Sequence, residues 1–297
     1  MAYYTEHTVL WQDGNIVKAS EAKTDLYGQS LHYGYAVFEG IRSYRTAGGA
    51  TRIFKAVEHY DRLRRSAEAV NMPFKYSTNE LIEATYNILE KNNFQDAYIR
   101  PVVYAPANMG FSLNTTSYTI IQVWEMAPFF GEKLLKVMTS SFQRPNPKAF
   151  HIEAKASGHY VNSILASQEA KAKGFDEALL TDMSGYIAEG TGANMFFEKD
   201  GALFTPAKGN ILPGITRATV LEICNQIDIP VKEGQYTIQE LKTADSAFFC
   251  GTAAEVIGWE SIDDVKFPAP WKETLGKKIQ QAYMDKVTER KTQLATA

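Results

Sequence analysis

Apolar and polar residues follow two different periods along this chain, and both occur within its first hundred residues. Residues 7–11 and 15–19 are predicted strands, and the Asp13-Gly14 pair between them is typical of a tight hairpin turn. Residues 55–71 place apolar side chains three or four positions apart, which predicts a helix. Its inward side is expected to carry Val57, Tyr60, Leu63, Ala67 and Val70.

A second helix is predicted over 81–93, because Ser77 and Glu80 stand three positions apart just before it, as in a capping box. Residues 50–54, 97–105 and 118–126 have the composition of strands. The pattern breaks at 127–132, and we place a domain boundary there. We therefore predict a small N-terminal domain over 1–126, an interdomain linker over 127–136 and a large C-terminal domain over 137–297.

The second half again mixes strands and helices. Strands are predicted over 133–141, 177–182, 185–190 and 246–251, with a hairpin at Asp200-Gly201, and helices over 160–173, 214–227 and 271–293. There is no internal repeat and no regular alternation of strand and helix, so a doubly wound sheet is not expected. The pattern indicates an α+β protein with two domains.

Composition narrows the possible partners. The chain has 297 residues, 45% of them hydrophobic and 22% charged, with a net charge of −3, so neither nucleic acid nor a membrane is expected as a partner. We expect no signal peptide and no membrane span. Cys224 and Cys250 lie far apart and are expected to be reduced thiols of a cytoplasmic protein. The five histidines lack metal-site spacing, so no metal is expected.

Two glycine-containing segments are candidates for binding a phosphate. In Leu212–Thr219, Pro213-Gly214 marks a helix start, whose free backbone N–H groups attract anions, and Thr216 adds a hydroxyl. An ordinary turn with Thr216 as the helix cap explains that segment as well. In Cys250–Glu255, small residues follow an apolar strand and Thr252 is a possible anion ligand, although a tight strand-to-helix connection is an equal explanation.

Four charged residues are candidates for chemistry. Tyr98 and Arg100 stand two apart in a predicted strand, so they share a face and suit a carboxylate, unless Arg100 only forms an edge-strand salt bridge. Glu189 lies among apolar and small residues and either faces a ring nitrogen or exposes its head to solvent. Lys155 has small neighbours, which suits a lysine approached by a flat molecule, but a surface lysine is the simpler explanation. A solvated or surface-paired side chain is also the simpler explanation for Arg62.

Taken together, seven motifs of this chain resemble the class IV aminotransferases that use pyridoxal 5′-phosphate (PLP), and most closely the branched-chain amino-acid aminotransferases. The motifs are LHYGYAVFEGIRSY, EHYDRL, AYIRPV, AKASGHYVNS, AEGTGANMFF, LPGITRA and GTAAEV, in that order, and the resemblance extends from about Val9 to Tyr283. It implies the two-domain α+β PLP fold of type IV, with a small N-terminal domain and a larger PLP-binding domain that has a barrel-like core.

The resemblance also gives these residues roles around the cofactor. Lys155 matches the lysine that bonds to PLP and moves the substrate α-proton, and Glu189 matches the carboxylate that keeps the pyridine nitrogen protonated. Room for the cofactor ring would then explain the small neighbours of Lys155. Tyr160 matches the phenol that binds the ring hydroxyl, and Leu212 matches the apolar residue that packs on the ring. The residues that match the phosphate-binding set are Arg62, Ile215, Thr216 and Thr252.

For the substrate, the resemblance implicates Phe38, Gly40, Tyr98, Arg100, Thr252 and Ala253, with Tyr33 acting from a partner subunit of a homodimer or higher homo-oligomer. The implied reaction moves the amino group of L-leucine, L-isoleucine or L-valine to 2-oxoglutarate, which gives branched 2-oxo acids and L-glutamate. One pocket must then accept both an apolar side chain and a carboxylate, for which Phe38 and Arg100 are suited.

Four positions depart from the family pattern: His159, Ala193, Met126 and Phe111. The first two are expected to affect the cofactor surroundings slightly, and the last two bear on the width of the substrate pocket. D-amino-acid and (R)-amine transaminases with the same fold remain alternatives, although residues 105–114 lack the Arg and His of the D-specific enzymes. A non-catalytic metabolite-binding protein is a more distant alternative, because Lys155 and Glu189 are both present.

Overall fold

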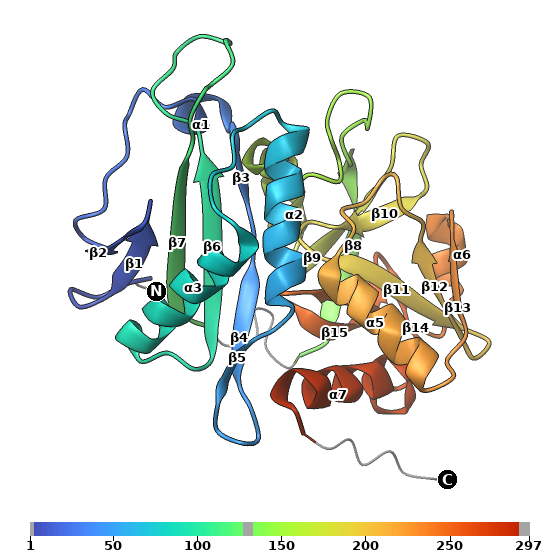
Figure 1. Ribbon diagram of the computed structural model, residues 1–297. Helices are drawn as coiled ribbons and strands as arrows, with labels where there is room; N and C mark the ends of the chain where they lie inside the picture. The colour runs from blue at the N-terminus through green and yellow to red at the C-terminus, as the bar shows by residue number, and fades with distance from the viewer. Residues whose placement is uncertain (1–2, 127–132, 291–297) are drawn as a thin grey trace. The chain divides into compact units, whose positions relative to one another are not determined.

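The computed structural model describes residues 3–126 and 133–290 and divides the chain into two compact units (Figure 1). The first unit contains residues 3–126 together with Ala154–Gly158, and the second contains residues 133–153 and 159–290. A short segment from the middle of the chain is therefore built into the N-terminal unit. Most of the predicted linker 127–136 falls outside the described residues, and its last two positions, Leu135 and Lys136, belong to strand β8.

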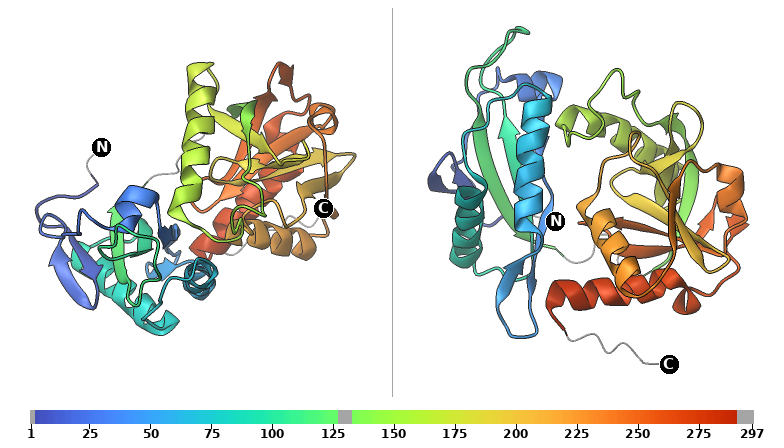
Figure 2. Two further views of the ribbon diagram at one scale, coloured as in Figure 1. Left: turned by 90° about the horizontal axis from the view of Figure 1, so that it is seen from above. Right: turned by 45° about the vertical axis from the view of Figure 1, so that its right-hand side comes forward.

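The first unit is an antiparallel sheet with helices packed on it. Its strand order among the described residues is β2-β1-β7-β6-β4-β5, with β3 paired to β6. The strands are β1 (Val9–Gln12), β2 (Asn15–Lys18), β3 (Ala36–Phe38), β4 (Ile41–Arg45), β5 (Thr51–Ile53), β6 (Ala97–Tyr104) and β7 (Tyr118–Glu125). The helices are α1 (Gln29–Tyr33), α2 (Ala56–Ala69) and α3 (Thr78–Asn92). Helices α2 and α3 contact each other and bury one face of this sheet (Figures 1 and 2).

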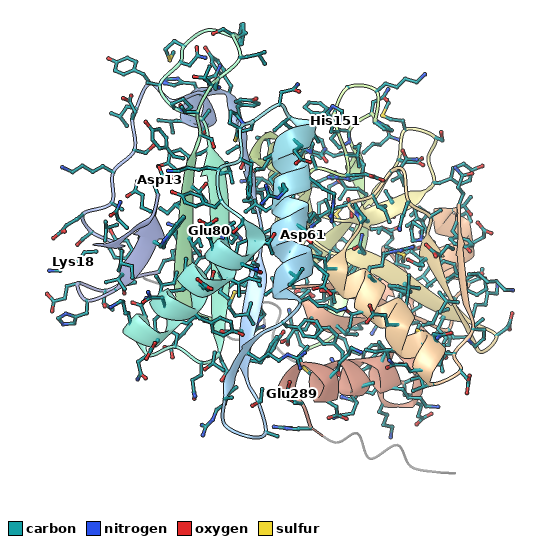
Figure 3. The ribbon with its side chains drawn as sticks, viewed as in Figure 1. Asp13, Lys18, Asp61, Glu80, His151 and Glu289 are labelled. Carbon is teal, nitrogen blue, oxygen red and sulfur yellow. The ribbon has the colours of Figure 1, made fainter. Side chains whose placement is uncertain are left out.

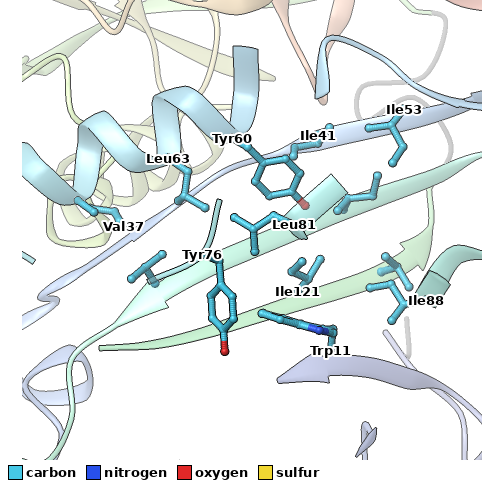
Figure 4. Packing of buried hydrophobic residues seen from close by; sticks show 14 of the residues in the cluster. Trp11, Val37, Ile41, Ile53, Tyr60, Leu63, Tyr76, Leu81, Ile88 and Ile121 are labelled. Atoms are coloured by element: carbon cyan, nitrogen blue, oxygen red, sulfur yellow. The ribbon is translucent and has the colours of Figure 1, made fainter. Parts of the chain in front are cut away.

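The core of the first unit lies between these two helices and the sheet (Figure 4). Tyr60 and Leu63 from α2, Leu81 from α3, and Ile99 from β6 are all fully buried there. Because side chains alternate along a strand, Ile99 faces the helices, and its neighbours Tyr98 and Arg100 project to the other face of the sheet. The alternation therefore separates a purely apolar face from one that carries charge.

A capping box sets the start of helix α3. Both hydrogen bonds of the predicted capping box are present at α3: Glu80 N–H donates to Ser77 Oγ at 3.3 Å, and Ser77 N–H donates to Glu80 Oε2 at 2.7 Å. Thr78 then ties the same turn to α2 by donating to Asp61 Oδ1 at 2.6 Å (Asp61 and Glu80 are labelled in Figure 3). The capping-box prediction is confirmed.

The second unit is built on a curled sheet with the strand order β10-β9-β8-β15-β14-β11-β12-β13, with β16 paired to β15 (Figures 1 and 2). Its strands are β8 (Leu135–Gln143), β9 (Glu177–Thr181), β10 (Ile187–Gly190), β11 (Asn194–Lys199), β12 (Ala202–Pro206), β13 (Val231–Gly234), β14 (Ser246–Gly251), β15 (Glu255–Ile262) and β16 (Val265–Lys266). Its helices are α4 (Tyr160–Ala172), α5 (Ile215–Gln226), α6 (Ile238–Lys242) and α7 (Leu275–Thr288), with 3-10 turns η1 (Ser157–His159, shared with the first unit) and η2 (Trp271–Glu273). Helix α4 packs on β8 and β9, while α5 and α7 contact each other and β14.

Most predicted elements are confirmed, and four details of the sequence interpretation are wrong. Val57 is 50% exposed rather than inward-facing. The last helix begins at Leu275, where Thr274 caps it, rather than at Trp271; the predicted end at 291–293 lies outside the described residues. The segment after Gly251 joins two antiparallel strands, β14 and β15, and not a strand to a helix. The short helices α1 and α6 were not predicted, although Thr237 and Glu240 form a capping box at α6.

Candidate active site

Lys155 lies in the short segment that is built into the first unit, and its backbone hydrogen bonds fix it there. Lys155 C=O accepts from Phe38 N–H at 3.0 Å, and Lys155 N–H donates to Ser66 Oγ of α2 at 3.0 Å. Ala156 pairs with Val37 and belongs to the hydrophobic core. The small neighbours of Lys155 thus allow the segment to lie tightly against β3, which is a packing reason that the sequence interpretation did not include.

Glycines allow the same segment to approach α1 closely. Gly158 N–H donates to Gly34 C=O at 3.0 Å, and a Cβ on Gly34 would lie 2.9 Å from Gly158 Cα. Gly34 also has a positive φ of 67°, which glycine adopts readily. The residues after α1 and after Lys155 are therefore held together by close backbone contacts.

An aromatic cluster surrounds Arg100 on the charged face of the first sheet. The guanidinium carbon of Arg100 lies 4.7 Å from the ring centroid of Phe38 and 5.4 Å from that of Tyr98. The ammonium nitrogen of Lys155 lies 4.9 Å from the same Phe38 ring. A Cβ on Gly40 would lie only 2.0 Å from Tyr98 Oη, so this position must be glycine for Tyr98 to hold its place. The structure thus brings Phe38, Gly40, Tyr98, Arg100 and Lys155 together within one unit.

Arg100 has no carboxylate partner among residues 3–126 and 133–290, and its Nε is buried without a hydrogen bond. Its Nη2 lies 3.4 Å from Tyr98 Oη, at the long end of the hydrogen-bond range. Strand β6 pairs on both sides, so the edge-strand salt bridge considered for Arg100 is wrong. The cation is held mainly by aromatic rings, and an anionic ligand would find its charge uncompensated.

A buried charged cluster of the first unit forms around Glu39. Glu39 is fully buried and accepts from Arg62 Nε at 2.6 Å, from Arg62 Nη2 at 2.9 Å and from His59 Nδ1 at 2.7 Å. Arg62 is only 6% exposed, so the expectation of a surface-solvated arginine is wrong. His59, Arg62 and Ser66 occur at spacings of three and four on α2 and share one face of that helix.

The charges in this cluster fix the protonation states of its members. Burial by itself raises the pKa of Glu39, but the charges of Arg62 and His59 and the hydrogen bonds from both outweigh it and hold that pKa well below its ordinary value. Burial lowers the pKa of His59 and outweighs the opposing effect of Glu39, and the charges of Arg62 and Lys155 lower it further. Glu39 is therefore ionised at neutral pH, and a neutral His59 carries its proton on the Nδ1 that donates to it.

In the second unit, Glu189 is a buried carboxylate held by an ion pair and by hydrogen bonds. It is 5% exposed and lies 2.9 Å from Arg144 Nε. Its oxygens also accept from Asn194 Nδ2 at 2.9 Å and from Leu212 N–H at 3.1 Å. A register shift between Ile187 and Glu189 in β10 sets the direction of this side chain. The expectation that its head faces solvent is therefore wrong, and Arg144, which no sequence pattern had indicated, balances its charge.

The start of α5 is arranged to receive an anion. Its N-cap is Gly214, which has no side-chain capping bond, and Thr216 sits inside the first turn with 4% exposure. Thr216 is thus not the helix cap. A Cβ on Gly214 would lie 1.9 Å from Asn194 Oδ1, so glycine is required there by the neighbouring amide. The backbone N–H groups of the first turn, beginning with Ile215, have no side-chain cap and suit a phosphate.

The remaining candidates lie at the ends of elements. Tyr160 begins α4 and is half-buried, while Thr252 and Ala253 are half-buried in the turn between β14 and β15. His159, just before Tyr160, packs edge-on against Phe150 with ring centroids 5.0 Å apart. Tyr33 ends α1 and is 46% exposed.

Tyr33 lies in an exposed apolar patch of the first unit. Its hydroxyl donates to Met109 C=O at 3.2 Å, and its ring centroid is 5.4 Å from that of Phe111. Phe111 is 89% exposed, and Leu31 and Leu113 are 64% and 78% exposed. We refer to Leu31, Tyr33, Met109, Phe111 and Leu113 as the apolar patch.

Two features are absent from the described residues. Across residues 3–126 and 133–290, every helix is too short or too polar to cross a bilayer. The same residues contain no group of three or more histidine, cysteine or acidic side chains suited to a metal ion.

The sequence and the fold together define the class of protein. The family model for amino-transferase class IV matches residues 36–262, which is most of the chain. The chain therefore belongs to the class IV aminotransferases. It is an aminotransferase, and its cofactor is pyridoxal 5′-phosphate.

Individual relatives are similar over nearly the whole chain. The branched-chain-amino-acid aminotransferase of Pseudomonas aeruginosa is 42% identical over 286 residues, which cover 94% of this chain and 93% of the relative. The structure of the Escherichia coli branched-chain amino acid aminotransferase matches with a TM-score of 0.92 at 34% identity over 98% of both chains. The PLP-bound branched-chain aminotransferase from Thermobaculum terrenum matches with a TM-score of 0.90 at 32% identity, covering 97% of this chain and 96% of that one.

Proposed function

We propose that this protein transfers the amino group of L-leucine, L-isoleucine or L-valine to 2-oxoglutarate and so forms branched 2-oxo acids and L-glutamate. The observation that carries the proposal is the ring of Phe38, which lies 4.7 Å from the guanidinium of Arg100 and 4.9 Å from the ammonium of Lys155. An apolar wall, an uncompensated cation and a reactive amine thus occur side by side. Branched side chains suit the wall, and the distal carboxylate of 2-oxoglutarate suits the cation.

Lys155 is the proposed catalytic base. The bound cofactor supplies a carbonyl that takes up the amino group and a conjugated ring that withdraws electrons from the substrate Cα. The amine of Lys155 would take the proton from the substrate Cα and give it up to the former carbonyl carbon of the cofactor, so that no proton is gained or lost overall. The hydrogen bonds to Ser66 and Phe38 keep the lysine backbone fixed while its long side chain moves.

Glu189 is the proposed partner of the cofactor's ring nitrogen. Its partner Arg144 favours the ionised carboxylate, and Asn194 and Leu212 N–H fix its orientation. An ionised carboxylate keeps a proton on the ring nitrogen, which strengthens electron withdrawal. We assign ring contacts to Tyr160 and Leu212, in agreement with the family resemblance.

The family resemblance assigns the cofactor phosphate to Arg62, Ile215, Thr216 and Thr252. The start of α5 fits it, because Ile215 and Thr216 offer backbone N–H groups without a side-chain cap. Thr252 and Arg62 complete the proposed set. For the substrate we assign Phe38, Gly40, Tyr98, Arg100, Thr252 and Ala253.

We also propose that the protein is a homodimer in which Tyr33 contributes to the partner's substrate site. The apolar patch around Tyr33 supports this, because Tyr33 contacts Met109 and Phe111 and all three are large exposed side chains. Sedimentation analysis tests the dimer, and Phe111→Asp should shift it towards monomer. A dimer that is insensitive to Phe111→Asp would contradict the use of this patch. The buried, unpaired Cys224 and Cys250 are consistent with a cytoplasmic setting.

Stopped-flow absorbance of the holoenzyme tests the proposed activity. The violet band of the bound cofactor should decay rapidly with L-leucine and not with D-alanine or (R)-1-phenylethylamine. Lys155→Ala should abolish both this band and turnover. A response to D-alanine or to the amine alone would instead assign the chain to one of the alternative transaminases, and turnover by Lys155→Ala would refute the role of the lysine.

A further inference from the structure

We propose that Trp124 is a positioning residue that holds Arg100 in place and thereby determines whether the site accepts a dicarboxylic substrate. The inference rests on the proposed function, because it deepens the role given there to Arg100. None of the sequence patterns indicated Trp124.

Trp124 lies directly opposite Tyr98 in the sheet. Strand β7 pairs with β6 in the register Tyr98 to Trp124, and side chains of directly paired residues stand on the same face. Their ring centroids are 5.1 Å apart at an interplanar angle of 32°. Ring contact with Trp124 and the close approach to Gly40 thus hold Tyr98 from two sides.

Trp124 also reaches Arg100, which comes next to Tyr98 on the same face. The guanidinium carbon lies 5.8 Å from the indole ring, in addition to the contacts with Phe38 and Tyr98. Tryptophan gives the strongest cation–π attraction of the aromatic side chains. Three rings therefore hold a cation that has no carboxylate partner in the described part of the chain.

Aromatic rings around Arg100 leave its charge available to a ligand, which a carboxylate partner would not. A carboxylate partner would neutralise Arg100 and compete with a substrate carboxylate for its N–H groups. Aromatic rings restrict the guanidinium but accept no conventional hydrogen bond. Apart from the 3.4 Å contact of Nη2 with Tyr98 Oη, its donors therefore stay available to a ligand. Trp124 is placed to keep Arg100 ready for an anion when the site is empty.

The outer side of Trp124 is covered by the start of the chain. The ring of Tyr3 meets the indole edge-on with centroids 5.4 Å apart, and Tyr3 itself is 64% exposed. Trp124 is half-buried as a result. Its ring is thus placed between Tyr98 and Tyr3, which limits the rotamers from which it contacts Arg100.

The test compares two oxo acids that differ in the side chain that Arg100 would bind. The pyridoxamine form of the enzyme is mixed with 2-oxoglutarate or with 4-methyl-2-oxopentanoate, and kcat/KM is measured for each. Trp124→Leu should lower the value for 2-oxoglutarate about tenfold, mainly through KM, and change that for the branched acid less than about threefold. Trp124→Phe should restore most of the loss, since it keeps an aromatic face.

The matched control is Tyr118→Leu, at the other end of β7, where Tyr118 is 42% exposed and packs on Tyr104. This variant should leave the ratio of the two kcat/KM values unchanged. If Trp124→Leu does not fold, Trp124→Met provides a flexible side chain without an aromatic face and should show the same selective loss.

Each outcome has a separate meaning. Equal losses with both oxo acids, or no loss with either, would overturn the positioning role while leaving the proposed function intact. A wild-type enzyme that converts the branched acid but not 2-oxoglutarate would instead refute the proposed acceptor, and the role of Trp124 with it.

Discussion

The buried cluster of Glu39, His59 and Arg62 predicts that neutralising one side chain will weaken the first unit strongly. Glu39→Gln keeps the shape of the side chain but removes the negative charge that Arg62 contacts, and Arg62 is only 6% exposed. Breaking a buried ion pair by removing one partner costs about 3–5 kcal/mol. The bidentate contact of 2.6 and 2.9 Å and the bond from His59 place this cluster in that class.

Hydrogen exchange followed by mass spectrometry measures this cost where it arises, because opening free energies differ between regions of a protein. Peptides from α2 should exchange at least about a hundredfold faster in Glu39→Gln, since each 1.4 kcal/mol is about a factor of ten. Glu58→Gln on the same helix is the control: Glu58 is exposed and pairs with Lys55 at 3.0 Å, and such surface pairs contribute about 0–1 kcal/mol. Equal exchange rates in the two variants would refute the reasoning.

The same cluster makes the first unit sensitive to acid. Both His59 and Glu39 have lowered pKa values in the folded chain, against ordinary values of 6.5 and 4.5. Near and below each ordinary value, the folded chain therefore binds fewer protons than the unfolded chain. Stability should therefore be complete above about pH 6.5 and fall on acidification, first as unfolded His59 takes up a proton and then, below about pH 4.5, as unfolded Glu39 does. In His59→Gln the first part of the decline should be absent, and an unchanged profile would contradict this assignment.

Three further substitutions test the site. Arg100→Ala should reduce kcat/KM for 2-oxoglutarate by about ten- to a hundredfold, because it removes one or two charged hydrogen bonds to the substrate carboxylate. The kcat/KM for L-leucine should fall much less. Equal losses for the two substrates would argue against the role of Arg100 with the carboxylate. Gly40→Ala should destabilise the protein by about 1–3 kcal/mol in thermal unfolding, because the new Cβ would lie 2.0 Å from Tyr98 Oη. Gly214→Ala should weaken binding of the cofactor in a titration, because its Cβ would displace Asn194, which bridges Glu189 and Leu212. Gly48→Ala, where a Cβ would meet only Thr46 Oγ1 at 3.9 Å, is the control for both glycine variants and should behave as wild type.

Local rules predicted those parts of this protein that depend on neighbours in the sequence. The capping box at Ser77 and Glu80 and the turn at Asp13-Gly14 follow from spacing over a few residues. The shared face of Tyr98 and Arg100 follows from the period of a strand. These features need no knowledge of which strands become neighbours.

The partners of the charged residues could not be predicted in this way. Arg144 lies 45 positions before Glu189, and Glu39 lies 23 positions before Arg62, so each pair forms only after the sheets assemble. Trp124 meets Arg100 through the register of β6 and β7, which periodicity within one strand cannot give. Motif resemblance indicated roles for Arg62 and Glu189 but not the residues that neutralise them, because a motif match assigns no pairing between distant segments.

On the proposed function, the environment of Arg100 explains how one pocket serves two unlike side chains. If Arg100 were paired with a carboxylate, the pocket would suit neither substrate. The ion pair would offer no free donor to 2-oxoglutarate and would place fixed charges beside a branched side chain. The rings of Phe38, Tyr98 and Trp124 compensate Arg100 in part, by about 0.5–2 kcal/mol for such contacts, which is less than a carboxylate provides. The empty or leucine-bound site is thus tolerable, and the carboxylate of 2-oxoglutarate still gains from binding. The same rings supply apolar surface for the isobutyl group, so discrimination by charge and by shape uses one set of side chains.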